Sequence, residues 1–247
     1  MTEAVAADHG LDPASVLLTN GVDEAVDLTL GLVDSGWFVH PGFDGYSDRA
    51  RALGRTGHLI GLDRDWEPML PPEQVAPDGG AVFLAQPHNP TGNLFRPEWV
   101  AQVLSRSADP DRPTFLDETY RDFALRPTVP PGTVDSAAPG LLRFQSFSKI
   151  HGLAGIRLGV LLGPVDLISR LRDRQRFHSV DSVALYGALG ALADPDHRDR
   201  FRRHVLAERP GYQMALAEHA LFAEVRSTEA NFVVARSRTG ISATGVA

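Results

Sequence analysis

The stretch Ser146-Phe147-Ser148-Lys149-Ile150-His151-Gly152 is the part of the chain around which the rest is organised, and Lys149 is its centre. Of the 24 lysine and arginine residues, 23 are arginine, so Lys149 is the single lysine. Arginine serves as a surface charge at least as well as lysine. Only lysine can lose its proton near neutral pH and add to a carbonyl carbon. We therefore interpret Lys149 as a Schiff-base lysine; the alternative is a surface lysine left by chance.

The composition indicates a globular chain that can bury a sizeable core. It has 247 residues, of which 43% are hydrophobic and 22% charged. A net charge of −7 argues against nucleic acid or an anionic membrane as the main partner. The absence of cysteine excludes disulfides, thiolate metal sites and cysteine nucleophiles, and we predict no metal site. No apolar run has the length of a membrane span, and the N-terminus lacks a signal-peptide pattern, which predicts a cytoplasmic protein.

Short apolar strands alternate with helices along the first two thirds of the chain. The pattern predicts helices at residues 22–33, 44–53 and 99–104, and strands at 37–40, 58–62, 81–85, 114–117, 141–144 and 158–162. The strand at 81–85 is apolar throughout, as expected for a strand buried on both faces of a parallel sheet. The alternation predicts an α/β fold with a mostly parallel sheet flanked by helices and ligands at the carboxyl ends of its strands.

The composition of the sequence changes after residue 164. Residues 165–222 are rich in arginine and alanine and predict helices with a break at Asp194-Pro195, followed by one last strand at 230–236. We predict a large domain over residues 1–165, a helical connection over 166–195 and a partial small α/β domain over 196–247.

Polar groups follow consecutive predicted strands. His88-Asn89-Pro90-Thr91-Gly92 comes after the strand at 81–85, and Asp117-Glu118-Thr119-Tyr120 comes at the end of the strand at 114–117. Alone, the first is an ordinary turn and Asp117 is an ordinary helix cap. Together with Lys149 they place an amide, a carboxylate, a phenol and an amine at one edge of the sheet. This set suits a flat, heteroaromatic cofactor that carries a carbonyl group.

The ordered motifs resemble those of the fold-type I, class I/II aminotransferases, which use pyridoxal 5′-phosphate. They are Asn-Pro-Thr-Gly at 89–92, Asp-Glu-x-Tyr at 117–120, Ser-Phe-Ser-Lys at 146–149 and an arginine eight residues after the lysine. The resemblance extends from about residue 11 to residue 236. Gly-Val-Asp-Glu at 21–24 and Ala-Asn-Phe-Val at 230–233 are similar to both the histidinol-phosphate aminotransferases and the threonine-phosphate decarboxylases. Pro-Gly-Phe-Asp-Gly-Tyr at 41–46 is closer to the decarboxylases.

The resemblance implies three catalytic residues. Lys149 would hold the cofactor as a Schiff base and then move the α-proton of the substrate. Asp117 would face the pyridine nitrogen and keep it protonated, so that the ring remains an electron sink. Tyr120, together with Asn89, would hydrogen-bond the phenolic oxygen of the cofactor.

The resemblance also implies how the rest of the cofactor is bound. Phe43 would stack on its ring. The phosphate would be bound by Arg157, by the hydroxyl groups of two serines and by the backbone amides of two residues at the start of a helix, namely Ser146, Ser148, Val22 and Asp23. His151 could touch the substrate, although we interpret it as a packed histidine.

The implied activity is the transfer of an amino group between an amino acid, or an amino phosphate, and a 2-oxo acid by a homodimer. Two alternatives stay open: a decarboxylase of the threonine-phosphate type and a catalytically silent domain that binds pyridoxal phosphate. Family members are longer at both ends, so the resemblance implies a chain shortened at both ends. The arginine that grips the substrate carboxylate in relatives would lie beyond Ala247. Arg236 and Arg238 are near that region in sequence but outside the matching motif.

Overall fold

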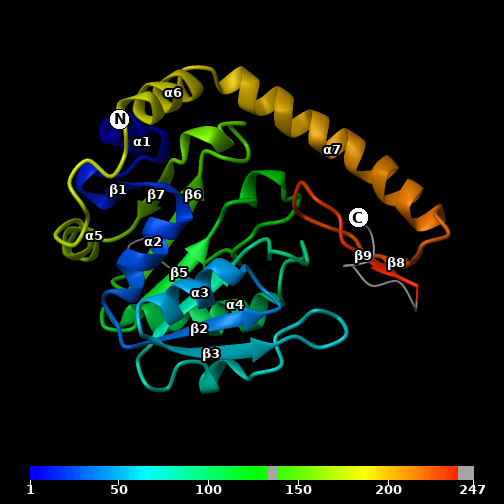
Figure 1. The fold of residues 1–247 in the computed structure, drawn as a ribbon, viewed down its shortest axis with the longest axis horizontal. Helices are drawn as coiled ribbons and strands as arrows, with labels where there is room; N and C mark the ends of the chain where they lie inside the picture. Colours follow the sequence, from blue (N-terminus) through cyan, green and yellow to red (C-terminus); the bar gives the residue numbers. More distant parts are fainter. Residues whose placement is uncertain (133–137, 239–247) are drawn as a thin grey trace.

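The computed structural model describes residues 1–132 and 138–238, within which a seven-stranded sheet forms the centre of the molecule (Figure 1). Its strands lie in the order β1-β7-β6-β5-β4-β2-β3. The pairs from β6 through β5, β4 and β2 to β3 are parallel, whereas β7 is antiparallel to both of its neighbours. This arrangement confirms the predicted mostly parallel α/β sheet. The strands are β1 (Val16–Thr19), β2 (Ser35–His40), β3 (Thr56–Gly61), β4 (Ala81–Ala85), β5 (Thr114–Asp117), β6 (Leu141–Ser146) and β7 (Gly159–Leu162).

Helices cover both faces of this sheet. On one face pack α2 (Gly21–Leu30), α3 (Asp44–Ala52) and α5 (Val165–Arg172). On the other pack α4 (Pro97–Ser105), α1 (Thr2–His9) and α6 (Ser182–Leu192). The short 3-10 helices are η1 (Pro13–Ser15), η2 (Pro72–Gln74), η3 (Arg106–Ala108), η4 (Arg121–Phe123) and η5 (Ala154–Ile156). Within the two described ranges, no helix is both long and apolar enough to cross a lipid bilayer.

A ladder of phenylalanines crosses the sheet beneath α2 and α3. The ring centroids of Phe38 and Phe83 are 5.2 Å apart, those of Phe83 and Phe115 are 5.2 Å apart, and those of Phe115 and Phe144 are 5.7 Å apart. Because side chains alternate along a strand, Leu116 points to the opposite face and packs with α4. Each face of the sheet therefore has its own apolar core.

The last part of the described chain consists of α7 (Pro195–Glu218) and a two-stranded antiparallel sheet of β8 (Phe222–Val225) and β9 (Ala235–Ser237). In Figure 1, α7 arches away from the main sheet and carries β8 and β9 at its far end. The strand predicted at residues 230–236 is wrong over most of its length, because β9 begins at Ala235. The physical reason is that the preceding segment follows another part of the chain: Glu229 N donates to Gly92 O at 2.7 Å.

Other differences from the sequence prediction are smaller. The strand β1 and the helix α1 were not predicted, and the predicted helical region is interrupted between α5 and α6. The division at residues 165 and 195 stays a prediction. Residues 239–247 of the predicted small domain lie outside the described residues.

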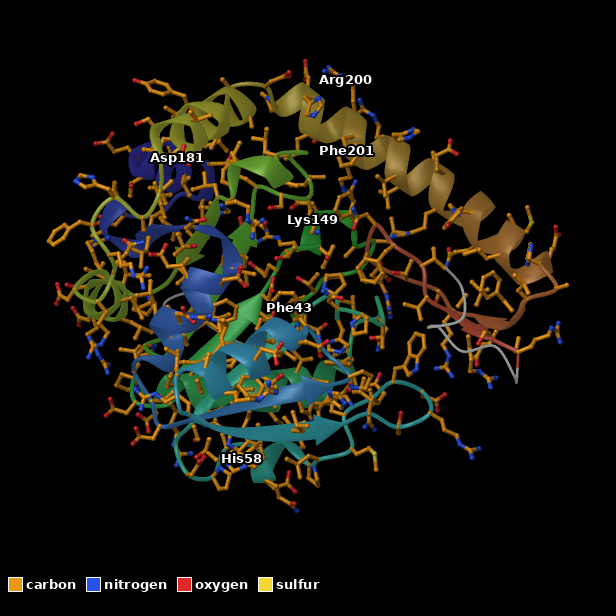
Figure 2. All side chains as sticks on the ribbon, in the orientation of Figure 1. Phe43, His58, Lys149, Asp181, Arg200 and Phe201 are labelled. Atoms are coloured by element: carbon orange, nitrogen blue, oxygen red, sulfur yellow. The ribbon has the colours of Figure 1, made fainter. Side chains whose placement is uncertain are left out.

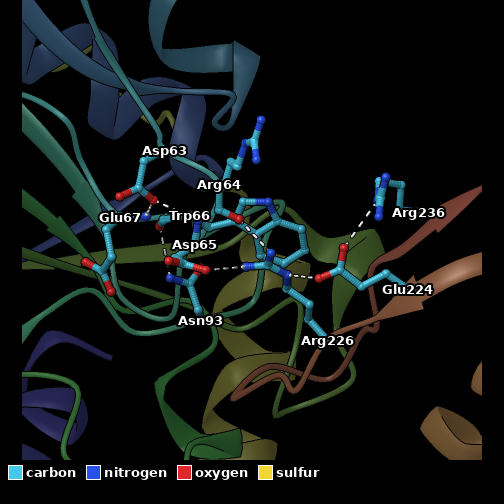
Figure 3. A network of polar contacts seen from close by, with 9 residues as sticks. All are labelled: Asp63, Arg64, Asp65, Trp66, Glu67, Asn93, Glu224, Arg226 and Arg236. Carbon is cyan, nitrogen blue, oxygen red and sulfur yellow. Dashed lines mark hydrogen bonds and ion pairs between the residues drawn. The ribbon is translucent and has the colours of Figure 1, made fainter.

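A cluster around Trp66 connects β8 and β9 to the large sheet (Figure 3). The guanidinium of Arg226 lies 4.7 Å from the centroid of the Trp66 ring, and its Nε is 2.5 Å from Oε1 of Glu224. Arg226 Nη2 also donates to the carbonyl of Arg64 at 2.6 Å. The carbonyl of Trp66 accepts from Asn93 Nδ2 at 3.1 Å. The small sheet is thereby fixed to the loop that carries Asn93.

We expect Phe115→Ala to lower the free energy of unfolding by about 3–5 kcal/mol, because it leaves a cavity in the middle of the ladder. Phe115 is 0% exposed. Urea unfolding followed by circular dichroism measures the change. Leu59→Ala is the control, since Leu59 is 58% exposed and its loss should change stability by less than about 0.5 kcal/mol. Equal effects of the two substitutions would contradict the assignment of the core.

Candidate active site

The carboxyl ends of β4, β5 and β6 open on a cavity of about 200 Å³. In Figure 2, Lys149 and Phe43 lie on the inner side of the arc made by α6 and α7. Four residues that were not predicted contribute to the lining: Gly21, Thr119, Phe144 and Ala154. Nine of the ten predicted site residues line the same cavity, namely Val22, Phe43, Asn89, Asp117, Tyr120, Ser146, Ser148, Lys149 and Arg157. The tenth, Asp23, does not line it.

The Lys149 loop joins β6 to β7 and is fixed by two apolar side chains. Phe147 and Ile150 are 4% and 3% exposed, so they hold the loop against the body of the molecule. Lys149 accepts a backbone hydrogen bond from Gly152 at 3.0 Å, which closes a turn. Gly152 has φ +68°, a left-handed conformation that favours glycine. This leaves Lys149 half-buried, with its Nζ 5.5 Å from the centroid of the Tyr120 ring.

Asp117 is a buried carboxylate at the last position of β5. It is 8% exposed. Its Oδ1 accepts the backbone N–H of Thr119 at 2.8 Å, and its Oδ2 accepts the hydroxyl of Tyr46 at 2.5 Å. Burial raises the pKa of Asp117, while these two hydrogen bonds act in the opposite direction. The side chain is thus held in one orientation at the edge of the cavity.

Tyr120 presents a phenol that keeps its proton. Burial raises the pKa of Tyr120 to about 12, and the nearby charge of Asp117 is the second, smaller cause. At neutral pH the hydroxyl group is therefore a hydrogen-bond donor. The ring is supported by Phe232, whose ring meets it edge-on with centroids 5.0 Å apart. The motif at residues 230–233 therefore contributes to the site indirectly, by packing against the ring of Tyr120.

The start of α2 and Arg157 form a place for an anion. The backbone N–H of Asn20, the residue before the helix, donates to Glu24 Oε2 at 2.6 Å, which stabilises the first turn. Gly21 has φ +70°, and a Cβ there would lie 2.8 Å from Nη2 of Arg157. The free amides of a helix N-terminus and a guanidinium both favour a phosphate. The carboxylate of Asp23 lies 3.8 Å from the same Nη2 and balances part of its charge.

The turn at residues 88–92 is held from both sides. His88 is 2% exposed, and its Nε2 is hydrogen-bonded to the carbonyl of Pro41 at 2.9 Å, in the loop that leads to Phe43. Gly92 has φ +75°, and a Cβ there would lie 2.2 Å from the hydroxyl of Thr228. These contacts fix the loop before Phe43 and the chain on either side of Asn89. The positions of Phe43 and Asn89 relative to each other are thereby fixed as well.

Arginines of α7 bind the loop that follows Tyr120. Arg209, 8% exposed, donates from Nη1 to the carbonyls of Phe123 at 3.0 Å and Ala230 at 3.1 Å. Arg202 Nε donates to the carbonyl of Asp122 at 2.6 Å. The helix α7 therefore fixes the loop that follows Tyr120 and the segment that carries Phe232.

Three further residues considered from the sequence lie elsewhere. Arg236 pairs with Glu224 at 3.2 Å and Arg238 donates to the carbonyl of Ala220 at 2.8 Å, so neither side chain lines the cavity. His151 stacks on Phe147 with centroids 4.5 Å apart, and burial lowers its pKa. This geometry matches the interpretation of His151 as a packed histidine.

Sequence reasoning missed Tyr46. It lies in α3, three residues after Phe43, and is buried against the phenylalanine ladder. Phe43 precedes α3 in an extended conformation, so helical spacing offered no signal that would place Tyr46 at the site. The partner of its hydroxyl, Asp117, is 71 residues away in the chain and could not be found from local spacing.

Comparison with known proteins adds the family. Residues 1–240 match the family described as aminotransferase class I and II. The chain is 30% identical over 239 residues to the histidinol-phosphate aminotransferase of Thermococcus gammatolerans, covering 95% of this chain and 66% of that protein. The crystal structure of the histidinol-phosphate aminotransferase from Clostridium acetobutylicum superposes with a TM-score of 0.86 at 20% identity, covering 96% of this chain and 72% of that one.

A second solved structure has the same fold. The histidinol-phosphate aminotransferase from Sinorhizobium meliloti, solved in complex with pyridoxal-5′-phosphate, gives a TM-score of 0.82 at 24% identity, covering 94% of this chain and 64% of that one. The chain spans about two thirds of the length of the curated relatives that it matches.

We expect His88 to stay neutral down to about pH 4 in the folded chain, because burial lowers its pKa from 6.5 to about 4. Its Nδ1 is buried and has no hydrogen-bond partner among the described residues, so a proton there would be unpaired. Below pH 6.5 the unfolded chain takes up a proton that the folded chain does not. This contribution to stability should fall from pH 6.5 to 4 by at most about 1.4 kcal/mol per pH unit.

The measurement compares urea unfolding of the parent chain and of His88→Gln between pH 4 and 7. The variant has no titrating group at this position, so the difference between the two curves isolates His88. A folded-state imidazole that titrates near pH 6.5 by nuclear magnetic resonance would contradict the prediction.

Proposed function

The chain belongs to the class I and II aminotransferases, and from this premise we propose that it is a pyridoxal 5′-phosphate-dependent aminotransferase. It would move an amino group between an amino acid, or an amino phosphate, and a 2-oxo acid. The observation that carries the proposal is that Asp117, at the end of β5, lines one cavity with Lys149 and Arg157 of the loop between β6 and β7.

The groups around the cavity fit pyridoxal phosphate. Lys149 would bind its aldehyde carbon covalently, Asp117 would pair with its ring nitrogen, and Phe43 would lie against its ring. Arg157 and the first amides of α2 would hold the phosphate, where the absent Cβ of Gly21 leaves space beside the guanidinium. When bound, this cofactor withdraws electrons from the α-carbon of the substrate.

The side chains then divide the remaining work. With the cofactor bound, the Lys149 amine would act as the base that removes the α-proton of the substrate and as the acid that returns a proton to the reacting carbon skeleton. Tyr120, as a protonated phenol, and Asn89, as an amide, would donate hydrogen bonds to the oxygen on the ring of the cofactor. Ser146 and Ser148 would add hydroxyl donors for the phosphate, and the Oγ of Ser146 accepts the N–H of Ser148 at 3.1 Å.

The partners in this proposal are small-molecule amino and 2-oxo acids and a second copy of the chain. Val183 and Tyr186 on α6 are 75% and 76% exposed, and the nearby Phe177 is 96% exposed. Large apolar side chains exposed within ten residues of one another in the sequence favour a protein interface here. A cytoplasmic location belongs to the same proposal, because the substrates of transamination are metabolites of that compartment.

Borohydride reduction of the chain mixed with pyridoxal phosphate should fix the pyridoxyl group to Lys149. Lys149 is the single lysine and lines the cavity, so the label should appear in one peptide. Peptide mass spectrometry locates it. Lys149→Arg keeps the positive charge without a reactive amine and should carry no label at this position. Label on the terminal amine with Lys149 unmodified would contradict the assignment.

A panel of amino donors, including histidinol phosphate because of the named relatives, should give keto product with 2-oxoglutarate as acceptor. Lys149→Ala should lower the rate by about 10²–10⁴-fold, since it removes the group that moves the proton. Carbon dioxide released in step with donor consumption would support a decarboxylase instead. A chain that carries the label at Lys149 but converts no donor would support a silent domain.

A further inference from the structure

Tyr46 reaches Asp117 from α3 as a fully enclosed phenol. The side chain is 3% exposed, and its hydroxyl donates to Oδ2 of Asp117 at 2.5 Å. Thr119 donates its backbone N–H to Oδ1 at 2.8 Å. Each oxygen of the carboxylate is therefore bound by one fixed donor and retains a further lone pair. Because each oxygen has its own donor, the carboxylate group of Asp117 is held against rotation about the Cβ–Cγ bond.

The ring of Tyr46 is itself held in place. Its centroid lies 5.3 Å from that of Phe83 and 6.1 Å from that of Phe115, in the ladder on the sheet. Phe43, which lines the cavity, meets it edge-on with centroids 5.2 Å apart. A donor locked by packing keeps its partner in a defined geometry, as a support for a functional group must.

The protonation states make Tyr46 the donor of this hydrogen bond and Asp117 its acceptor. Burial, together with the neighbouring charge of Asp117, raises the pKa of Tyr46 well above its usual value, so its hydroxyl stays a donor. Burial raises the pKa of Asp117, and the hydrogen bond from Tyr46 counteracts part of that increase. Removing the donor would make Asp117 easier to protonate, because a buried carboxylate would lose a bond to its charged form.

We propose that Tyr46 is a positioning residue that keeps Asp117 ionised and oriented toward the cavity. Asp117 then offers a fixed negative charge to the protonated ring nitrogen of a pyridine cofactor. The purpose of the contact rests on the proposed function, whereas its effect on the carboxylate does not.

The first test follows the carboxyl carbon of Asp117 by nuclear magnetic resonance in the cofactor-free chain labelled with ¹³C-aspartate. Asp117→Asn identifies the resonance. Tyr46→Phe keeps the packed ring and removes only the donor, so the ionisation constant of Asp117 should fall by about 10- to 100-fold. Tyr120→Phe is the matched control, because Tyr120 lines the cavity but makes no hydrogen bond to Asp117 among the described residues. An unchanged titration in Tyr46→Phe would overturn the proposal.

A second measurement keeps the test decisive even where the variant is poorly folded. In the parent chain the hydroxyl proton of Tyr46 should be slow to exchange and visible, and Asp117→Asn should shift it to a weaker hydrogen bond. A hydroxyl proton of Tyr46 that is unaffected by Asp117→Asn would overturn the proposal.

The affinity for pyridoxal phosphate, measured by fluorescence quenching between pH 5 and 9, connects the contact to the cofactor. As the pH is lowered, Tyr46→Phe should lose affinity at a higher pH than the parent chain, because its Asp117 becomes neutral earlier. Identical pH profiles would overturn the role toward the cofactor. A parent chain that binds no pyridoxal phosphate at any pH would refute the proposed function and leave the carboxyl titration standing as a separate result.

Discussion

The two-residue repeat along β5 is the constraint on which the site depends. Phe115 and Asp117 are two residues apart, so both point to the face covered by α2 and α3, whereas Leu116 points to the other face. The alternation of side chains that places Phe115 in the ladder therefore also directs the carboxylate of Asp117 into apolar surroundings. A shift of one residue in the pairing of β5 would exchange these faces, and the core and the site would be lost together.

The second half of the described chain supports this edge of the sheet from outside. Arg209 binds the loop after Tyr120, Phe232 packs against the Tyr120 ring, and Glu229 bonds to the carbonyl of Gly92. The cluster around Trp66 adds a connection through Asn93. Residues that do not line the cavity therefore help to fix the positions of Tyr120 and of the turn that carries Asn89.

Much of the fold and most of the candidate site could be predicted from local patterns. The apolar run at 81–85 and the strand ending at Asp117 coincide with β4 and β5, because buried parallel strands leave a clear signal. The strand expected at 230–236 could not be predicted correctly, since the contact of Glu229 with Gly92 comes from 137 residues away in the chain. Tyr46 was missed for the same reason. Its role depends on a partner brought close only by folding.

The arginines of α7 have a consequence for the electric field around the cavity. Arg202 and Arg209 bind backbone carbonyls, and among the described residues neither forms an ion pair. A guanidinium stays protonated throughout the physiological range, and a carbonyl carries no net charge to cancel it. Two guanidinium charges without a direct ion pair among the described residues therefore lie beside the loop that follows Tyr120, although the chain as a whole carries −7. Their positive charge offsets part of the negative charge of Asp122 and Glu229 near that loop, which weakens the repulsion of anionic small molecules on this side of the protein.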